Sequence, residues 1–171
     1  VYESSASGYH KVQVNDNRPW WNSVDKYMPV GSSDNLARCH VISFEAIRLG
    51  VWQALVEYMY GSKKWSDFTG AINRLRNAVF PYGGTASTHT SATHASKLGT
   101  IANALYNHIN TTLPKIQTAT PAKQVAYADE IVLCMNSSPD NLRVADAKTN
   151  SSIGSGLDPR GWDIDTTKKD S

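Results

Sequence analysis

His40 is the side chain of this chain best placed to take a proton near neutral pH, because it stands near the end of a short strand candidate, residues 37–42. A neutral imidazole can accept a proton from water and then needs a partner for its other ring nitrogen. Asn141, far along the chain, carries an uncharged amide oxygen that is able to hold that nitrogen. The two residues are therefore candidates for a general base and its support.

Asn150 follows Asn141 by nine residues and is a candidate metal ligand. An amide oxygen is a hard ligand of the kind that Mg²⁺ accepts while it keeps several of its waters. Arg143 and Lys148 lie between the two asparagines, and Arg143 is the stronger candidate for holding a phosphate or stabilising its charge. A base, a hard ligand and a cation together suit hydrolysis of a phosphodiester by an activated water.

The elements that would position these residues are helical in the middle of the chain and extended at its two flanks. Apolar residues recur every three or four positions in four stretches: 44–58, 65–79, 98–109 and 121–135. We therefore expect residues 44–136 to be mostly helical, in about four helices. Residues 141–144 form a second short extended segment, after the turn cluster NSSPD at 136–140, and Asp146 is a cap for a last short helix.

The segment 140–150, with the sequence DNLRVADAKTN, resembles the second half of the ββα-metal finger of the His-Me finger (HNH-like) nucleases. It is similar to the finger of the colicin-type and the non-specific secreted nucleases. In that family one strand ends in a catalytic His, a second strand begins with a structural Asn, and a helix presents a metal-binding His or Asn. His40, Asn141 and Asn150 match these three positions.

The resemblance implies an α+β fold that is mostly helical, with a small ββα-metal finger whose loop carries a large helical insertion. The halves of the finger would be residues 37–43 and 137–158, and residues 44–136 would be the insertion. Residues 1–171 are then expected to be a single nuclease domain.

The resemblance also implies a single divalent metal held by Asn150. Cys39 stands where colicin-type nucleases place a second metal-binding His, and Gly154 stands where their helix carries a further one. Families with Asn at the helix position bind Mg²⁺ through one direct protein ligand. Mg²⁺ is therefore the expected cofactor, with Mn²⁺ or another divalent cation as the alternative. Arg38 and Arg160 are further candidates for contacting phosphate.

Composition limits the classes of function. A net charge of +2 over 171 residues argues against a protein that coats nucleic acid, although an enzyme needs only a local basic patch. No apolar stretch approaches the length of a membrane span, so no membrane partner is expected. The two cysteines, Cys39 and Cys134, are too few for a zinc site, and their redox state stays open. Cys39 is a poor nucleophile for a base at His40, because neighbouring strand residues point to opposite faces.

We expect a Mg²⁺-dependent endonuclease that hydrolyses phosphodiester bonds, with DNA as its substrate and little sequence preference. Two alternatives stay open: an RNase built on the same finger, and a non-catalytic helical binding module in which the asparagines are structural. The small size and the resemblance to toxin nucleases favour a toxin or effector domain. Such a domain would be secreted or delivered into a target cell and would have an immunity protein as a partner.

Overall fold

The computed structural model describes residues 24, 26–28, 35–84 and 92–146. This part of the chain is mostly helical and contains a two-stranded antiparallel sheet, as expected for an α+β protein. The elements follow in the order β1 (Leu36–His40), α3 (Phe44–Tyr60), α4 (Trp65–Val79), α5 (Ala92–Thr112), α6 (Lys115–Thr118), α7 (Pro121–Asn136), the 3₁₀ turn η1 (Pro139–Asn141) and β2 (Leu142–Asp146).

Helices α3 and α4 begin where their sequences supply a hydrogen-bond acceptor for the first turn. The Ser43 hydroxyl accepts from the Ala46 N–H at 3.2 Å and so caps α3. In the first turn of α4 the Asp67 carboxylate accepts from the Lys64 N–H at 2.8 Å. The four helical stretches predicted from periodicity are confirmed as α3, α4, α5 and α7, and the structure adds the short α6 between α5 and α7.

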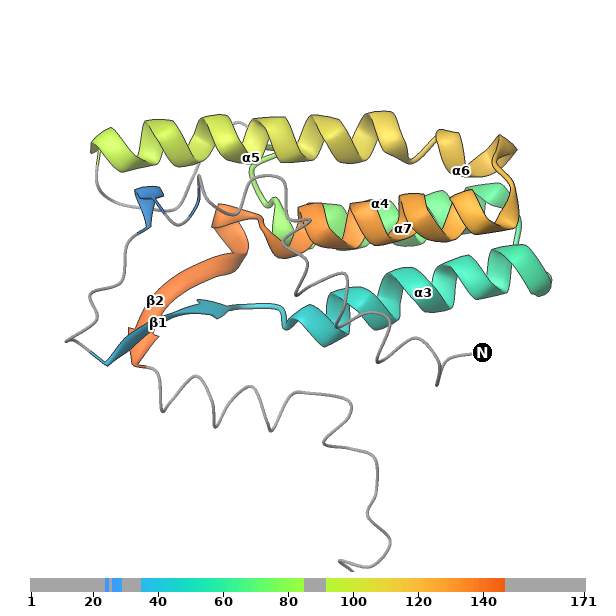
Figure 1. Cartoon of the computed structure of the whole chain (residues 1–171), viewed down its shortest axis with the longest axis horizontal. Coiled ribbons are helices and arrows are strands. Elements are labelled where there is room, and N and C mark those ends of the chain that lie inside the picture. Colours follow the sequence, from blue (N-terminus) through green and yellow to red (C-terminus); the bar gives the residue numbers. More distant parts are fainter. Residues whose placement is uncertain (1–23, 25, 29–34, 85–91, 147–171) are drawn as a thin grey trace, which may run out of the picture.

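Helix α7 is the central element of the helical body. It packs against α3 on one side and α5 on the other, and Figure 1 shows it between them. Pro121 occupies its first turn, and every residue from Ile131 to Asn136 is buried. The largest fully buried side chains come from α3 to α7, from Phe80 directly after α4, and from β2, and they form one core: Ile47, Leu55, Phe68, Ile72, Phe80, Leu98, Leu105, Ile109, Ile116, Ile131, Met135 and Leu142.

Strands β1 and β2 pair although the whole helical body separates them in the sequence. Their register places His40 opposite Leu142, Cys39 opposite Arg143, and Arg38 opposite Val144. Figure 1 shows this two-stranded sheet at one end of the helices. The sheet is called the hairpin below, although its strands are joined through the helices. Since the buried side chain of Leu142 belongs to the core, the base of the hairpin is attached to the helical body.

Two strands flanking a helical insertion agree with the expected arrangement, whereas the third part of a ββα finger lies outside the described residues. The helix expected from Asp146 onward, Asn150 and Arg160 all fall beyond residue 146, so those expectations stay predictions. Within the described ranges, no helix is both long and apolar enough to cross a bilayer.

Candidate active site

The ring of His40 is held by the last residue of α7. His40 ends β1 and is partly buried, and its Nε2 atom lies 3.1 Å from the main-chain oxygen of Asn136. A carbonyl oxygen can only accept a hydrogen bond, so Nε2 must carry a proton. In the neutral ring the lone pair then resides on Nδ1, which is the nitrogen able to act as a base.

Asn141 fastens the end of β1 to the start of β2. Its Oδ1 accepts from the Ile42 N–H at 2.8 Å, and its Nδ2 donates to the Ile42 carbonyl at 2.9 Å. The main-chain oxygen of Asn141 accepts from the Val41 N–H at 2.8 Å. With only 2% of its surface exposed, Asn141 makes these bonds in the protein interior. The turn that follows His40 is therefore held at both its N–H and its C=O groups.

The structure corrects the role predicted for Asn141. Its amide was expected to hold the second nitrogen of the His40 ring, yet its described bonds go to the backbone of Ile42. The reason is the register: His40 pairs with Leu142, so Asn141 lies beside the turn after His40 rather than beside the ring. Asn141 supports His40 indirectly, by fixing the backbone two residues further on.

Arg143 lies on the face of the hairpin opposite His40. Successive residues of a strand alternate between faces, so His40 shares a face with Arg38, and Cys39 shares the other face with its partner Arg143. The exposed Arg143 side chain turns back on its own chain and donates from Nη1 to the carbonyls of Asp140 and Leu142, at 3.2 and 2.7 Å. The structure therefore brings His40 and Asn141 together but does not place Arg143 beside the ring.

Cys39 is kept protonated rather than activated. Burial raises the pKa of the Cys39 thiol, and the Asp146 charge adds to this effect, against a lowering by a backbone hydrogen bond at Ala145. A thiol with a raised pKa is a weak nucleophile at neutral pH. Together with its position on the face opposite His40, this argues against a thiol–imidazole pair.

Five buried polar residues lie in the segment from the end of α7 to the start of β2, residues 136–141. Ser138 donates its hydroxyl proton to the carbonyl of Val79 at 2.6 Å, which connects this segment to the end of α4. The two amide atoms of Asn136 and the hydroxyl of Ser137 are buried without a hydrogen-bond partner. Each of the five side chains is at most 4% exposed: Asn136, Ser137, Ser138, Asp140 and Asn141. The residue types of this segment predict a turn, but they give no sign that the segment is buried.

A second imidazole lies in the helical body. The Nε2 atom of His108 on α5 is 2.5 Å from a carboxylate oxygen of Glu130 on α7. The pair is partly exposed and connects two packed helices, α5 and α7. Among the described residues, no group of three or more His, Cys, Asp or Glu side chains could hold a metal ion.

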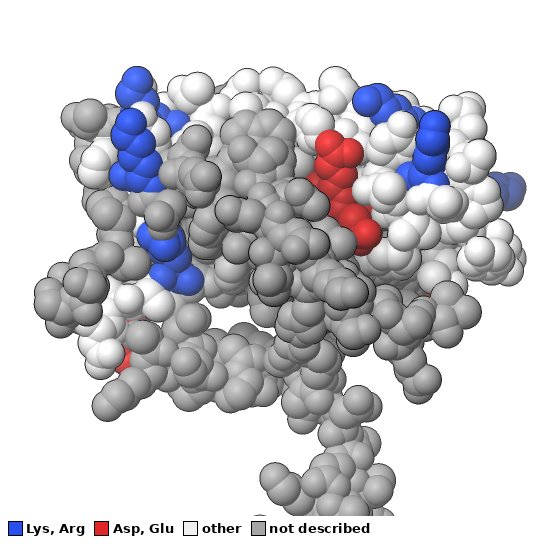
Figure 2. All heavy atoms as spheres, viewed as in Figure 1, with Lys and Arg blue, Asp and Glu red and all other residues white. Residues whose placement is uncertain are grey.

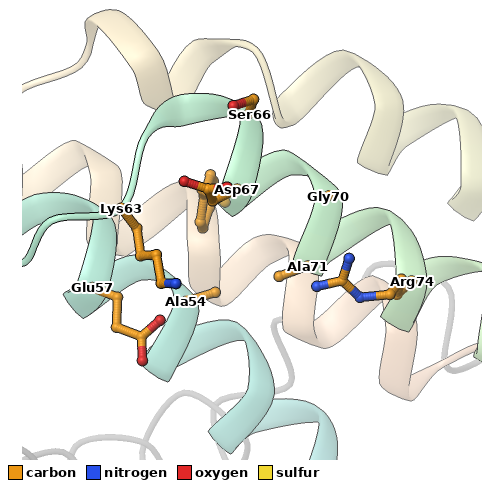
Figure 3. A pocket seen from close by; sticks show the side chains of 9 residues that line it. Ala54, Glu57, Lys63, Ser66, Asp67, Gly70, Ala71 and Arg74 are labelled. Carbon is orange, nitrogen blue, oxygen red and sulfur yellow. The ribbon is translucent and has the colours of Figure 1, made fainter.

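A cavity of about 300 Å³ lies between α3 and α4, away from the hairpin. Figure 3 shows Lys63 and Arg74 on its rim together with Glu57 and Asp67. Ala54, in its wall, lies ten residues along α3 from Phe44, so the cavity is about 15 Å of helix away from the hairpin base. Its charges balance, and none of the predicted site residues lines it, so it does not fit a phosphate-binding active site.

The positive charge is local. In the view of Figure 2 Lys and Arg side chains lie at both ends of the molecule, with acidic side chains between them and a further small acidic patch at the lower left, near β1 and β2. Such a distribution gives separate basic areas on a chain whose net charge is only +2.

Comparison of the chain with family models, with curated proteins and with solved structures finds no match. The geometry around His40 is therefore the basis for assigning a function.

Proposed function

We propose that the chain is a metal-dependent endonuclease of the His-Me finger type, with His40 as the general base. The observation that supports this best is the position of two residues in the hairpin. His40 is the last residue of β1, and Asn141 directly precedes β2 and binds the turn after His40. This order is the one that the resemblance implies for the two strands of the finger.

In the proposed reaction, Nδ1 of His40 takes a proton from the water that attacks the phosphorus atom. The bond from Nε2–H to the Asn136 carbonyl keeps the ring in the tautomer that this step needs. Asn141 holds the backbone that carries the ring, which limits the movement of His40 relative to the scissile phosphate.

The metal in this proposal is Mg²⁺, with Mn²⁺ as the alternative, and Asn150 is its protein ligand. A cation held by Asn150 alone requires no second ligand from the described residues around His40. The Asn141 oxygen already accepts a hydrogen bond, and the Cys39 thiol belongs to the other face of the hairpin. Bound there, the cation would neutralise charge on the phosphate and on the leaving oxygen.

Arg38 and Arg143 are proposed to contact the phosphates of the substrate. Arg38 shares the face of His40 and is the better candidate for the scissile phosphate. Arg143, exposed on the other face, would contact the phosphates of the nucleic acid that neighbour the scissile phosphate. Guanidinium groups suit both tasks because they bind phosphate oxygens through paired N–H donors.

The substrate we propose is DNA, and RNA is the alternative, since the chemistry does not require a deoxyribose. A toxin or effector domain delivered into a target cell, and restrained by an immunity protein in the producing cell, would fit such an activity. A non-catalytic helical module is the competing proposal, and the two bonds of Asn141 to Ile42 would serve that function equally well.

One experiment separates these proposals. The protein is incubated with plasmid DNA and with RNA, in Mg²⁺ and in EDTA, and the assay is repeated with His40→Ala and Asn150→Ala. We expect cleavage of DNA in Mg²⁺ only, and a loss of about 10²-fold or more in His40→Ala, the scale typical of a general base. Cleavage confined to RNA would select the alternative substrate. If neither polymer is cut, or if His40→Ala cuts like the parent protein, the nuclease proposal is wrong.

A further inference from the structure

Hydrogen bonds from the backbone and side chains of residues 135–138 connect α4 to the candidate base. It starts at Val79, the last residue of α4, whose carbonyl oxygen accepts from the Ser138 hydroxyl at 2.6 Å. Ser138 is fully buried, and it lies two residues after Asn136, the last residue of α7. The Ser138 N–H donates to the Met135 carbonyl at 3.2 Å, which closes the turn at the end of the helix. The Ser138 side chain thus fixes the end of α7 against the end of α4.

The same helix end carries the acceptor for His40. The carbonyls of the last turn of a helix have no partner within the helix and need one from elsewhere. For the Asn136 carbonyl the structure provides Nε2–H of His40 at 3.1 Å. The C-terminal end of a helix also carries partial negative charge, which stabilises a ring that has gained a proton. The direction of this one carbonyl therefore affects the orientation of the ring.

We propose that Ser138 is a positioning residue for His40, acting through the end of α7. The predicted effect of Ser138 on catalysis rests on the proposed nuclease function, whereas its predicted effect on the position of the His40 ring does not. If the Ser138 hydroxyl is removed, the turn after α7 loses its attachment to α4. The Asn136 carbonyl then samples other directions, and the His40 ring is held less firmly.

The chain offers a closely matched control at the adjacent position. Ser137 is also fully buried, but its hydroxyl has no hydrogen-bond partner. Ser137→Ala and Ser138→Ala remove the same atom from neighbouring buried sites, and only the second removes a hydrogen bond. A difference between the two variants therefore reports on the bond from Ser138 to Val79.

The test measures two quantities in the complete chain for the parent protein and both variants. The first is kcat and KM for DNA cleavage in Mg²⁺, at a temperature at which circular dichroism shows all three to be folded. We expect Ser138→Ala to lower kcat about 10-fold or more with KM nearly unchanged, as for a displaced catalytic group, and Ser137→Ala to resemble the parent. The second quantity is the NMR signal of the His40 Nε2 proton, which should weaken through exchange with water only in Ser138→Ala.

The outcomes distinguish this inference from the proposed function. If the parent protein cuts no nucleic acid, the proposed function fails, and the His40 signal in the two variants still tests the connection. Equal kcat values, or equally protected Nε2 protons, in Ser137→Ala and Ser138→Ala would overturn the inference. Should Ser138→Ala not fold, native-state hydrogen exchange of the parent protein decides. The Ser138 amide and the His40 Nε2 proton should then open together, and opening rates that differ 10-fold or more would contradict the proposal.

Discussion

The side chain of Asn141 binds both backbone groups of Ile42, with Oδ1 accepting at 2.8 Å and Nδ2 donating at 2.9 Å. The two residues are 99 positions apart in the sequence. An amide side chain that pairs with a peptide in this way replaces two rungs of a strand ladder at a point where β1 has already ended. The turn from β1 into α3 is consequently fixed by a residue that follows the whole helical body in the sequence.

Asn141→Ala should destabilise the protein strongly. The substitution leaves the N–H and C=O of Ile42 without their partner in a partly buried position. A hydrogen bond contributes about 1 kcal/mol net, whereas a buried group left unpaired costs about 1–3 kcal/mol, and the partial burial of Ile42 places its two groups toward the lower part of that range. We expect the free energy of unfolding to fall by about 2–4 kcal/mol, measured by urea denaturation. A fall of less than about 0.5 kcal/mol would mean that the two bonds to Ile42 do not hold this turn.

Asn136→Ala is the matched comparison and should change the stability of the protein little. Asn136 is as deeply buried as Asn141, with 1% of its surface exposed, but neither atom of its side-chain amide has a hydrogen-bond partner. Alanine removes two unsatisfied polar atoms and keeps the main-chain carbonyl that holds His40. The free energy of unfolding should stay within about 1 kcal/mol of the parent value, because the small cavity offsets the relief. A loss as large as that of Asn141→Ala would show that the Asn136 amide has a partner in solution.

Periodicity predicted the helical part of this chain well. Ile47, Val51 and Leu55 recur at helical spacing, and all three are buried in α3. Such a pattern depends on local spacing, so it can be detected without knowledge of distant contacts. The pairing of β1 with β2 is different, because it joins segments on either side of the helices. Only the resemblance of their residues to a known finger placed them together.

The partners of the site residues could not be predicted in the same way. Asn141 was identified as a supporting residue, yet its actual partner is a backbone turn rather than the ring of His40. The atom that does hold the ring is a main-chain carbonyl of Asn136, and every residue type carries one. Its direction follows from where α7 ends in three dimensions, which no side-chain pattern encodes.

Asp129 on α7 should make the stability of the protein depend on pH. Burial raises the pKa of its carboxyl group from 3.8 to about 6, and the Trp52 side chain and the Arg48 charge act in the opposite direction. The folded protein thus binds this proton more tightly than the unfolded chain does. The stabilisation is fully present below pH 3.8 and is lost as the pH rises through about 6.

Asp129→Asn tests this dependence, since it keeps the shape of the side chain and cannot ionise. A shift of this size corresponds to about 3 kcal/mol for a fully buried group, and solvent screening of the partly exposed carboxylate reduces it to about 1 kcal/mol. We expect the variant to be more stable than the parent at pH 7 by about that amount and to lose the advantage near pH 4. Thermal unfolding measured between pH 4 and pH 8 checks the slope. An advantage for the variant that grows toward low pH would contradict the assignment.

Arg38 and Arg143 should contribute differently to cleavage, because β1 and β2 present them on opposite faces. Arg38 shares the face of His40, so Arg38→Ala is expected to lower kcat at least about 10-fold, as for the loss of one donor to a charged transition state. Arg143→Ala is expected to change kcat by less than about 3-fold. Its effect should instead be on KM and on the dependence of binding on salt, as for a contact to the phosphate backbone.

Steady-state kinetics at two salt concentrations would separate the two contributions. The Arg38 guanidinium also donates to the Met28 carbonyl at 3.0 Å, so the stability of Arg38→Ala has to be measured first and the assay run well below its melting temperature. The decisive comparison is the ratio of the two kcat values at saturating DNA. If Arg143→Ala lowers kcat as much as His40→Ala does, the guanidinium reaches the scissile phosphate around the hairpin edge, and the separation of the two faces does not govern catalysis.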